Sequence, residues 1–263
     1  MIVAVLNSGS NGNCCYVSDG TDAILVDAGL SCKQIEYRMM QLGLRPETVR
    51  GVFVSHEHSD HIFGLKGLYK KHRIPIYMTD ATREAAGLPL PSEAYRSIGT
   101  RSRVDIGGLS IEVFPVSHDA ADPHQFTVST DSVRFGVFTD LGYPSEQVKG
   151  IFRTCDAVVL ETNYDEDMLD NGPYPLALRQ RISGQHGHLS NRQAFELFQE
   201  HRNPQLSHVF LGHLSQENNS PDKVMHLFGP QAGRTRLVMT SRHGATPVYR
   251  IGRQAAQLFL FDP

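Results

Sequence analysis

The sequence predicts an α/β fold in which two sheets pack together and helices cover their outer faces. The chain opens with three apolar segments, near residues 2–7, 14–18 and 23–27, that are typical of strands and lead into a helix. The second half repeats this order, with strands near 156–160 and 207–212 between helical segments. Two halves of this kind agree with such a fold, and a chain of 263 residues can build two packed sheets with flanking helices around one core.

Turn and capping residues mark where the elements begin and end. Ser31 with Gln34 three residues later is a capping-box pattern, and Gly43 is typical of a helix C-terminus. The remaining elements follow from hydrophobic spacing. We expect a helix from Leu65, a strand at 74–77, a strand-rich region over 94–139, helices near 175–183 and 191–200, a helix that begins at Ser220-Pro221, and strands near 236–240 and 247–251 that complete the second layer.

Composition and charge limit the class of protein. No stretch has the composition of a linker, so we predict a single domain over residues 1–263. The net charge of −3 gives no overall attraction to nucleic acid, so a polyanion would have to be held locally. Four cysteines without Cys-x-x-Cys spacing, together with the lack of a signal peptide or membrane span, predict a cytoplasmic protein with reduced thiols and no membrane contact.

The turn over residues 56–61 carries the strongest functional signal. It reads His-Glu-His-Ser-Asp-His and directly follows an apolar segment that is typical of a buried strand. His56 and His58 can offer two imidazoles to one ion, while Asp60 and His61 can serve a second ion nearby. Imidazole and carboxylate ligands suit zinc, manganese or iron. The turn therefore predicts a site for two metal ions.

This turn resembles the metal-binding motif of the metallo-β-lactamase superfamily, whose fold is a four-layer αββα sandwich. The resemblance implies further ligands at later strand ends, where the sequence has His118, Asp140 and His213. It also implies two divalent ions, either zinc or manganese. Matched position by position, the resemblance implies one ion held by His56, His58 and His118, a second held by Asp60, His61 and His213, and Asp140 as the bridge between them.

Short insertions and four local motifs extend the resemblance to the YycJ/WalJ family of compact bacterial proteins. About twenty residues separate His118 from Asp140 and about seventy separate Asp140 from His213, which leaves no room for an added nucleic-acid-binding arm or domain. The resemblance implies a 5′-to-3′ exonuclease that acts on DNA, with RNA as a second candidate substrate. The four motifs that carry it are residues 7–13, 116–123, 187–191 and 212–219.

Two residues are candidates for the catalytic chemistry. Asp60 would ligate one ion and face the bridging water, so it is the candidate to take the proton of that water. His188 is the candidate proton donor to the leaving oxygen, because an imidazole has a near-neutral pKa. It precedes a helix that Ser190 and Gln193 begin with a capping-box pattern, and such a helix start attracts phosphate. The alternative is that His188 only caps or packs this helix.

Small polar residues in the motifs are candidates for contact with the substrate: Ser8, Asn13, Ser190, Asn191 and Ser215. Such residues let the backbone approach a phosphate, although turns between strands have the same composition. Lys66, Lys70 and Arg73 share one face of a predicted helix and could meet a nucleic-acid backbone. A solvated helix face is the favoured interpretation of these three residues.

The shared ligand set leaves two other functions open. A small-molecule hydrolase of the same fold, such as a thioesterase, a lactonase or a cyclic-nucleotide phosphodiesterase, would use the same ligands. The Gly-His-Leu-Ser-Asn motif at 187–191 argues against this class, and direct substrate screening would decide the question. A non-catalytic binding protein is the third hypothesis, and the complete set of seven ligands argues against it.

Overall fold

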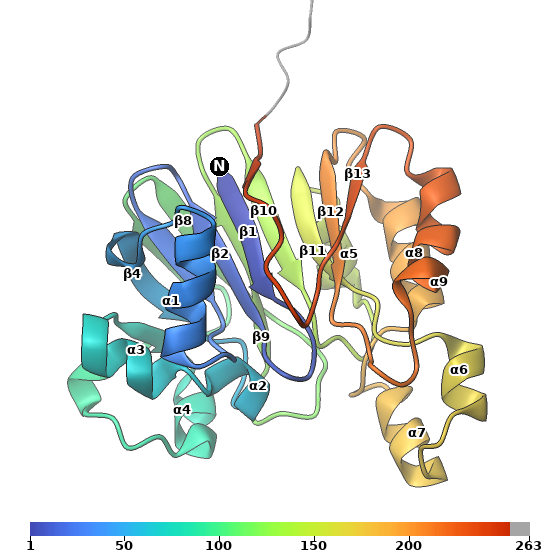
Figure 1. The fold of residues 1–263 in the computed structure, drawn as a ribbon, viewed down its shortest axis with the longest axis horizontal. Helices are drawn as coiled ribbons and strands as arrows, with labels where there is room; N and C mark the ends of the chain where they lie inside the picture. The colour runs from blue at the N-terminus through green and yellow to red at the C-terminus, as the bar shows by residue number, and fades with distance from the viewer. Residues whose placement is uncertain (253–263) are drawn as a thin grey trace, which may run out of the picture.

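The computed structural model describes residues 1–252 and has the four layers that the sequence predicts (Figure 1). Two seven-stranded sheets lie face to face within this part of the chain. Helices α1 (Cys32–Gln41) and α3 (Leu65–His72) cover the outer face of the first sheet. Helices α8 (Asn191–His201) and α9 (Pro221–Phe228) cover that of the second. Residues 253–263 of the predicted domain lie outside the described residues.

The first sheet combines the N-terminal strands with the last described strand. Its strand order is β14-β1-β2-β3-β4-β5-β6. Strands β1 to β3 are antiparallel neighbours, whereas β3 to β6 run parallel. Its strands are β1 (Ile2–Asn7), β2 (Cys14–Ser18), β3 (Ala23–Val26), β4 (Val49–Phe53), β5 (Ile76–Met78), β6 (Tyr95–Ser97) and β14 (Tyr249–Arg250).

The second sheet has the order β13-β12-β11-β10-β9-β8-β7. Strands β7 to β10 are antiparallel neighbours, and β10 to β13 run parallel. Each sheet therefore has a parallel half whose carboxyl ends share one edge. The strands of the second sheet are β7 (Arg103–Ile106), β8 (Leu109–Pro115), β9 (His124–Ser129), β10 (Arg134–Phe138), β11 (Ala157–Glu161), β12 (His208–Gly212) and β13 (Arg236–Met239).

Alternating side chains of the strands fill separate hydrophobic cores. In β1, Val3 and Val5 face the other sheet, while Ala4 and Leu6 belong to the core under α1 and α3. The core between the sheets contains Phe53 and several other aromatic side chains. A third core lies between the second sheet and its helices. Both faces of each sheet are thus covered, as a four-layer arrangement requires.

The helix starts predicted from capping residues are confirmed. Ser31 and Gln34 form a capping box at the start of α1, and Ser190 and Gln193 form one at α8. Hydrophobic spacing predicted α7 (Leu176–Ile182) but missed several short helices with few buried residues. The missed helices are α2 (Ser59–Ile62), α4 (Asp80–Ala86), α5 (Glu146–Phe152) and α6 (Glu166–Asn171), together with 3₁₀ turns at Pro46–Thr48, Ser92–Ala94 and Gly229–Gln231.

The last described strand corrects one prediction. The segment near 247–251 is expected to complete the second layer, but β14 pairs with β1 of the first sheet, with Arg250 opposite Ile2. The amino group of Met1 also donates a hydrogen bond to the carbonyl of Ile251, at 2.8 Å. The chain returns to its N-terminal sheet because β1 would otherwise leave its outer backbone groups unpaired.

The cysteines and the helix lengths bear on the expectations from composition. The thiols of Cys14, Cys15, Cys32 and Cys155 are all free. Burial raises the pKa of Cys155 to about 12, which makes this thiol unreactive. Among residues 1–252, no helix combines the length and apolar character that crossing a bilayer demands.

Candidate metal centre

The predicted ligands meet at the edge where the parallel strands end, in the lower part of Figure 1. The turn over 56–61 follows β4 and runs into α2. His118 follows β8, Asp140 follows β10 and His213 follows β12. Strand β8 runs in the same direction as β10, because both are antiparallel to β9. The topology thus delivers distant side chains to one place.

Five groups of described side chains have the spacing that a metal ion needs, and two of them match the ligand sets that the sequence analysis names. Within each group the ligand atoms lie within 4.8 Å of one another: His56, His58 and His118 in the first, and Asp60, His61 and His213 in the second. Asp140 forms a further such group with His56 and His61, so it stands between the other two. The structure therefore brings together all seven residues that the sequence analysis names as ligands.

Asp140 has an oxygen atom whose bonding capacity the protein leaves unused. Its Oδ2 is buried and accepts no hydrogen bond from residues 1–252, although His61 Nε2 lies 3.5 Å away. Its Oδ1 lies 3.3 Å from His213 Nδ1 and 3.9 Å from His118 Nε2. A buried carboxylate oxygen without a partner costs more than about 1–3 kcal/mol. Cations between Asp140 and the histidines would remove that cost, so the donor set fits two divalent ions.

Backbone conformation directs three acidic or imidazole side chains toward this cluster. Asp27, Asp140 and His213 have left-handed φ angles of 59°, 55° and 55°. Each follows the end of a parallel strand, β3, β10 or β12. This conformation costs about 1 kcal/mol or more for a residue other than glycine, and it is found where surrounding contacts enforce it. The tight turn swings each side chain across the sheet edge.

Asp27 is a buried carboxylate that the sequence analysis missed, and it orients His61. His61 Nδ1 donates to Asp27 Oδ2 at 2.8 Å, and Ser55 donates both its N–H and its hydroxyl to the same carboxylate. Burial alone would lower the pKa of His61, but the carboxylates of Asp27, Asp140 and Asp60 raise it well above its usual value. This excess of negative charge favours a bound cation. The sequence signal that could have identified Asp27 is an acidic residue directly after a predicted strand.

Glu161 is a second missed carboxylate, fully buried at the end of β11. Its Oε1 accepts hydrogen bonds from Nδ1 of both His213 and His188, each at 2.8 Å. Its Oε2 accepts the backbone N–H groups of Leu141, at 3.0 Å, and Leu189, at 3.1 Å. Burial would raise the pKa of Glu161, but the two histidines hold it well below its usual range. One charged carboxylate therefore fixes a predicted ligand and the predicted proton donor together.

His188 lies at the cavity over the cluster, with 22% of its side chain exposed. Because Nδ1 binds Glu161, Nε2 is the ring nitrogen left for a substrate. The loop before His188 also supports a ligand, since His118 Nδ1 donates to the Gly187 carbonyl at 3.1 Å. A Cβ atom at Gly187 would lie 2.1 Å from the carbonyl oxygen of Ile182, so only glycine fits there.

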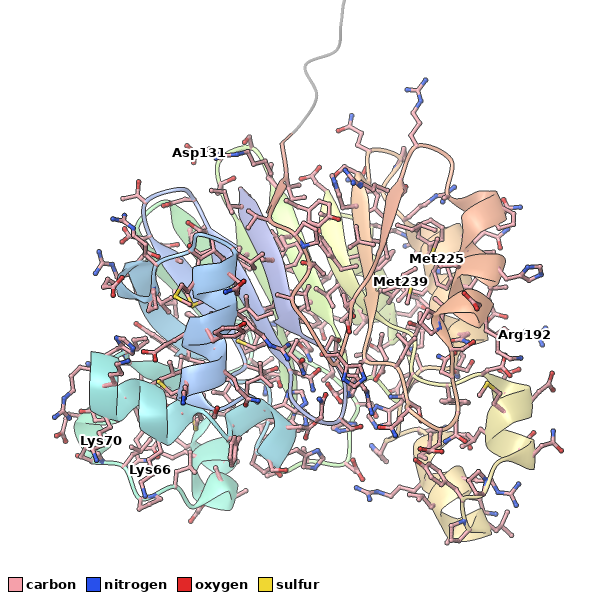
Figure 2. All side chains as sticks on the ribbon, viewed as in Figure 1. Lys66, Lys70, Asp131, Arg192, Met225 and Met239 are labelled. Atoms are coloured by element: carbon pink, nitrogen blue, oxygen red, sulfur yellow. The ribbon has the colours of Figure 1, made fainter. Side chains whose placement is uncertain are left out.

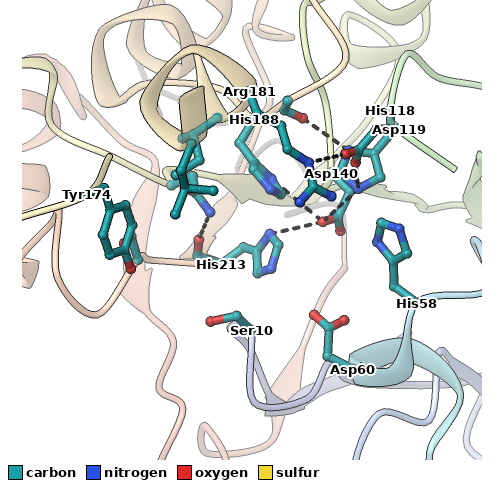
Figure 3. A pocket seen from close by; sticks show the side chains of 15 residues that line it. Ser10, His58, Asp60, His118, Asp119, Asp140, Tyr174, Arg181, His188 and His213 are labelled. Carbon is teal, nitrogen blue, oxygen red and sulfur yellow. Dashed lines mark hydrogen bonds and ion pairs between the residues drawn. The ribbon is translucent and has the colours of Figure 1, made fainter. Parts of the chain in front are cut away.

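A cavity of about 280 Å³ opens over the cluster of candidate ligands (Figure 3). Candidate ligands such as His58, Asp60 and His118 line one side, and residues of α7 line another. Of the five predicted substrate contacts, only Ser215 lines this cavity within the described part of the chain. Ser10 also lines it, from the loop that contains Ser8 and Asn13.

Ser8 and Asn13 lie behind the ligands instead of at the cavity wall. Ser8 Oγ accepts the backbone N–H of His213 at 2.8 Å. Asn13 Nδ2 lies 3.2 Å from Asp60 Oδ2, to which it donates, and 3.1 Å from His61 Nε2. The polar side-chain groups of both residues contact predicted ligands, so a contact with the substrate stays a prediction that concerns their backbone.

Ser190 and Asn191 are both buried, and their side chains form hydrogen bonds inside the protein. Ser190 Oγ accepts the N–H of Gln193 at 3.1 Å and donates to Glu166 Oε1 at 3.0 Å. Asn191 exchanges two hydrogen bonds with Asn219, at 2.9 and 2.7 Å. The motif that contains them therefore anchors the start of α8.

Two lysines of α3 lie away from the cavity, whereas Glu57 lies within the ligand turn itself. Lys66 and Lys70 are exposed on the outer side of α3, away from the cavity (Figure 2). Glu57 Oε1 accepts the backbone N–H of Ala121 at 2.8 Å, which ties the ligand turn to the segment after His118. The lysines thus belong to a solvated helix face, and Glu57 supports the site from outside the ligand groups.

Comparison with known proteins identifies the family. The chain matches the Beta-lactamase superfamily domain over residues 22–213, which include every predicted ligand. Exodeoxyribonuclease YycJ of Bacillus anthracis is 37% identical over 221 residues, which are 82% of this chain and 83% of that protein. The chain belongs to the YycJ/WalJ family of the metallo-β-lactamase superfamily. Exodeoxyribonuclease WalJ of Streptococcus pneumoniae is 35% identical over 225 residues, 82% of each chain.

A solved structure agrees with this YycJ/WalJ fold. The metallo-β-lactamase fold protein YhfI of Bacillus subtilis superposes with a TM-score of 0.73 at 16% identity, covering 94% of this chain and 98% of that one. At this identity the likeness concerns the fold. The predicted four-layer sandwich and the predicted family are both confirmed.

Proposed function

We propose that this protein is a metal-dependent exonuclease that removes nucleotides stepwise from the 5′ end of DNA, with RNA as a second candidate substrate. The observation that carries the proposal is the meeting of two ligand groups at Asp140, whose buried Oδ2 accepts no hydrogen bond from the described residues. Family membership supports the same function, because the two curated relatives are named exodeoxyribonucleases. The reaction is the hydrolysis of a phosphodiester.

The proposed ligands fall into two groups that share one carboxylate. His and Asp ligands serve zinc and manganese alike, so both metals are candidates and availability decides between them. Asp140 would offset the repulsion between two close dications. The proposed assignment is His56, His58 and His118 for one ion, Asp60, His61 and His213 for the other, and Asp140 for both.

Asp60 is the proposed base. Two bound divalent ions would lower the pKa of a water and stabilise charge on the attacking and leaving oxygens. Burial would raise the pKa of Asp60, but His61 and His213 lower it, so the group is a charged carboxylate that can bind a cation and accept a hydrogen bond from a water. Asn13 Nδ2 donates to Asp60 Oδ2 and fixes the orientation of the group. Asp60 would orient the attacking water and take its proton.

His188 is the proposed acid, and Glu161 is its positioning residue. The hydrogen bond from Nδ1 to Glu161 sets the ring orientation and leaves Nε2 to hold the proton that goes to the departing sugar oxygen. The same Glu161 oxygen holds His213, so the acid and a ligand keep a fixed relation to each other.

The proposed setting of this reaction is the cytoplasm, where the four free thiols stay reduced. A single domain over residues 1–263 would carry both the ligands and the acid. The short segments between the ligands give the site an open approach without an added arm, so a nucleic acid would be held mainly around the cavity.

A time course with end-labelled nucleic acid tests the proposed function. Strands of DNA and RNA with a 5′-phosphate or a 5′-hydroxyl are incubated with zinc or manganese, and products are sized. We expect stepwise release of nucleotides from the 5′ end of DNA, and affinity that falls as salt increases. Internal cuts alone would contradict an exonuclease. Intact DNA together with rapid thioester hydrolysis would favour a small-molecule hydrolase.

A further inference from the structure

One wall of the cavity has no part in the chemistry proposed above. The segment 174–182, which includes α7, contributes Tyr174, Leu178 and Ile182 to this wall. These residues are spaced by four, so they fall on one face of the helix and its preceding turn. All three are half-buried. Figure 3 shows Tyr174 on the opposite side of the cavity from His58.

A single guanidinium accompanies this apolar wall. Arg181 is the only lysine or arginine among the described residues that line the cavity. Its Nε lies 2.5 Å from Asp119 Oδ2, and 64% of its side chain is exposed. Asp119 directly follows the proposed ligand His118. An exposed guanidinium next to the cluster can exchange its carboxylate partner for a phosphate, because both anions accept the same pair of N–H groups.

The two sides of the cavity together have the chemistry of a nucleotide. The side with the candidate metal ligands suits a phosphate. The apolar and aromatic side carries no charge that would favour a phosphate, and its two aliphatic side chains offer no hydrogen bond to a sugar. A nucleobase offers a flat face that stacks on aromatic side chains. The volume of about 280 Å³ lies at the lower limit of small-ligand sites, which range over about 300–1,000 Å³. Such a cavity encloses one nucleotide and leaves the rest of a strand outside.

We propose that the wall formed by Tyr174, Leu178 and Ile182, which we call the base wall, binds the base of the terminal nucleotide. Tyr174 provides the stacking surface, and Arg181 contacts a phosphate of the same nucleotide. This proposal rests on the proposed nuclease function and names the part of the substrate that the site recognises. Stacking does not read the hydrogen-bonding edge of a base, so the wall accepts all four bases.

Two small probes test the base wall directly. Thymidine 5′-monophosphate and 2-deoxyribose 5-phosphate differ by the base, and calorimetry measures the affinity of the metal-loaded protein for each. We expect the nucleotide to bind roughly 5- to 150-fold more tightly, the range for a base stacked on an aromatic ring. Tyr174→Ala should remove most of this preference, and Tyr174→Phe should keep it. Leu176→Ala is the matched control in the same segment, because Leu176 is 61% exposed and outside the cavity wall.

Two results would overturn the base wall. One is equal affinity of the wild-type protein for both probes, which needs no variant to fold. The other is an unchanged preference in Tyr174→Ala. These results can be distinguished from a failure of the proposed exonuclease function. A protein that degrades DNA without preferring the nucleotide refutes the base wall alone, whereas one that prefers the nucleotide but leaves DNA intact refutes the exonuclease and keeps the wall.

Discussion

The two sheets contribute to the cluster of proposed ligands in different ways. The first sheet supplies four of the proposed ligands from one turn, residues 56–61, directly after β4. The second sheet supplies His118, Asp140 and His213 from three separate strand ends. Ligands that lie in one turn can be recognised from the sequence alone. Ligands at separate strand ends form a site only because the strand order brings those ends together.

The buried carboxylates behind the ligands differ in the same way. Asp27 of the first sheet holds one proposed ligand, His61. Glu161 of the second sheet holds a proposed ligand, His213, and the proposed acid, His188. In the proposed mechanism Asp27 therefore supports metal binding alone, whereas Glu161 couples metal binding to proton transfer. Variants of the two carboxylates should fail in different ways.

Removal of the shared carboxylate should have the largest effect. Asp140→Ala should lose at least one ion and reduce DNA hydrolysis below detection, because nothing then offsets the repulsion between two dications. Metal analysis and a DNA assay measure the two effects. Asp131→Ala is the matched control, since Asp131 is exposed on the β9–β10 turn at the opposite edge of the molecule (Figure 2). Wild-type hydrolysis by Asp140→Ala would show that the ligand assignment is wrong.

The two buried carboxylates can be compared directly. Asp27→Asn and Glu161→Gln should each weaken metal binding about 10- to 100-fold, as expected when a ligand loses its orienting partner. Saturating metal should restore most turnover in Asp27→Asn. Glu161→Gln should retain a further loss of about 10²- to 10⁴-fold, because His188 has also lost its partner. Turnover measured against metal concentration distinguishes the two.

A folding control is needed for Glu161→Gln. The amide group of glutamine would place a donor against the N–H groups of Leu141 and Leu189 or against the histidines. This mismatch costs about 1–3 kcal/mol of folding free energy, so thermal unfolding should accompany the kinetics. If both variants were folded and regained the same turnover at saturating metal, Asp27 and Glu161 would not differ in role as proposed.

Loss of the acid alone should affect turnover and not metal content. His188→Ala should keep two ions and lose about 10²- to 10⁴-fold in DNA hydrolysis, the range for a missing general acid. The defect should shrink for a nitrophenyl phosphodiester, because that leaving group departs without a proton. Equal defects on both substrates would refute proton donation and favour phosphate binding. Loss of metal would place His188 among the ligands.

The far edge of the sandwich should give the smallest effect. Asp19 Oδ2 accepts the N–H of Gly108 at 2.7 Å and so ties the first sheet to the β7–β8 turn of the second. Burial acts to raise the pKa of Asp19, but backbone donors, including Thr21 and Asp22, lower it below the usual value. Its stabilising effect is therefore present above the ordinary pKa of about 3.9 and is lost as pH falls through the lowered value.

Asp19→Ala should lower the free energy of unfolding by about 1 kcal/mol at neutral pH, after allowance for solvent screening. The difference should vanish in strong acid, where the carboxylate of the wild type is also protonated. Chemical denaturation at several pH values measures it. A difference that does not change with pH would mean that the side chain acts by packing. Metal content and turnover should match the wild type.

Local signals predicted much of the fold. The capping box of Ser31 and Gln34 identified the start of α1, and the turn over 56–61 identified the ligand edge. Short helices such as α5 escaped because they bury few residues, although Ser145 caps α5 and was a usable signal. The sheet that β14 joins could not be read from its own two residues, because the free edge of β1 decides it.

The parts of the site that the sequence did not reveal depend on distant partners. Glu161 looks like an ordinary strand residue until His213, 52 positions later, lies against it. Ser190 and Asn191 have a composition typical of phosphate-binding loops, but Gln193 and Asn219 occupy their side chains. Polar composition alone does not distinguish a residue that meets a substrate from one that holds the wall behind it.

The central claim is that the two sheets together hold two metal ions. The most direct test is elemental analysis of the purified protein after loading with manganese or zinc. It should use a Cys32→Ala background, because Cys32, Glu36 and His72 form a separate group with ligand spacing on α1 and α3. The account predicts two ions per chain in this background. A value that stays at one, or at zero despite supplementation, would contradict it.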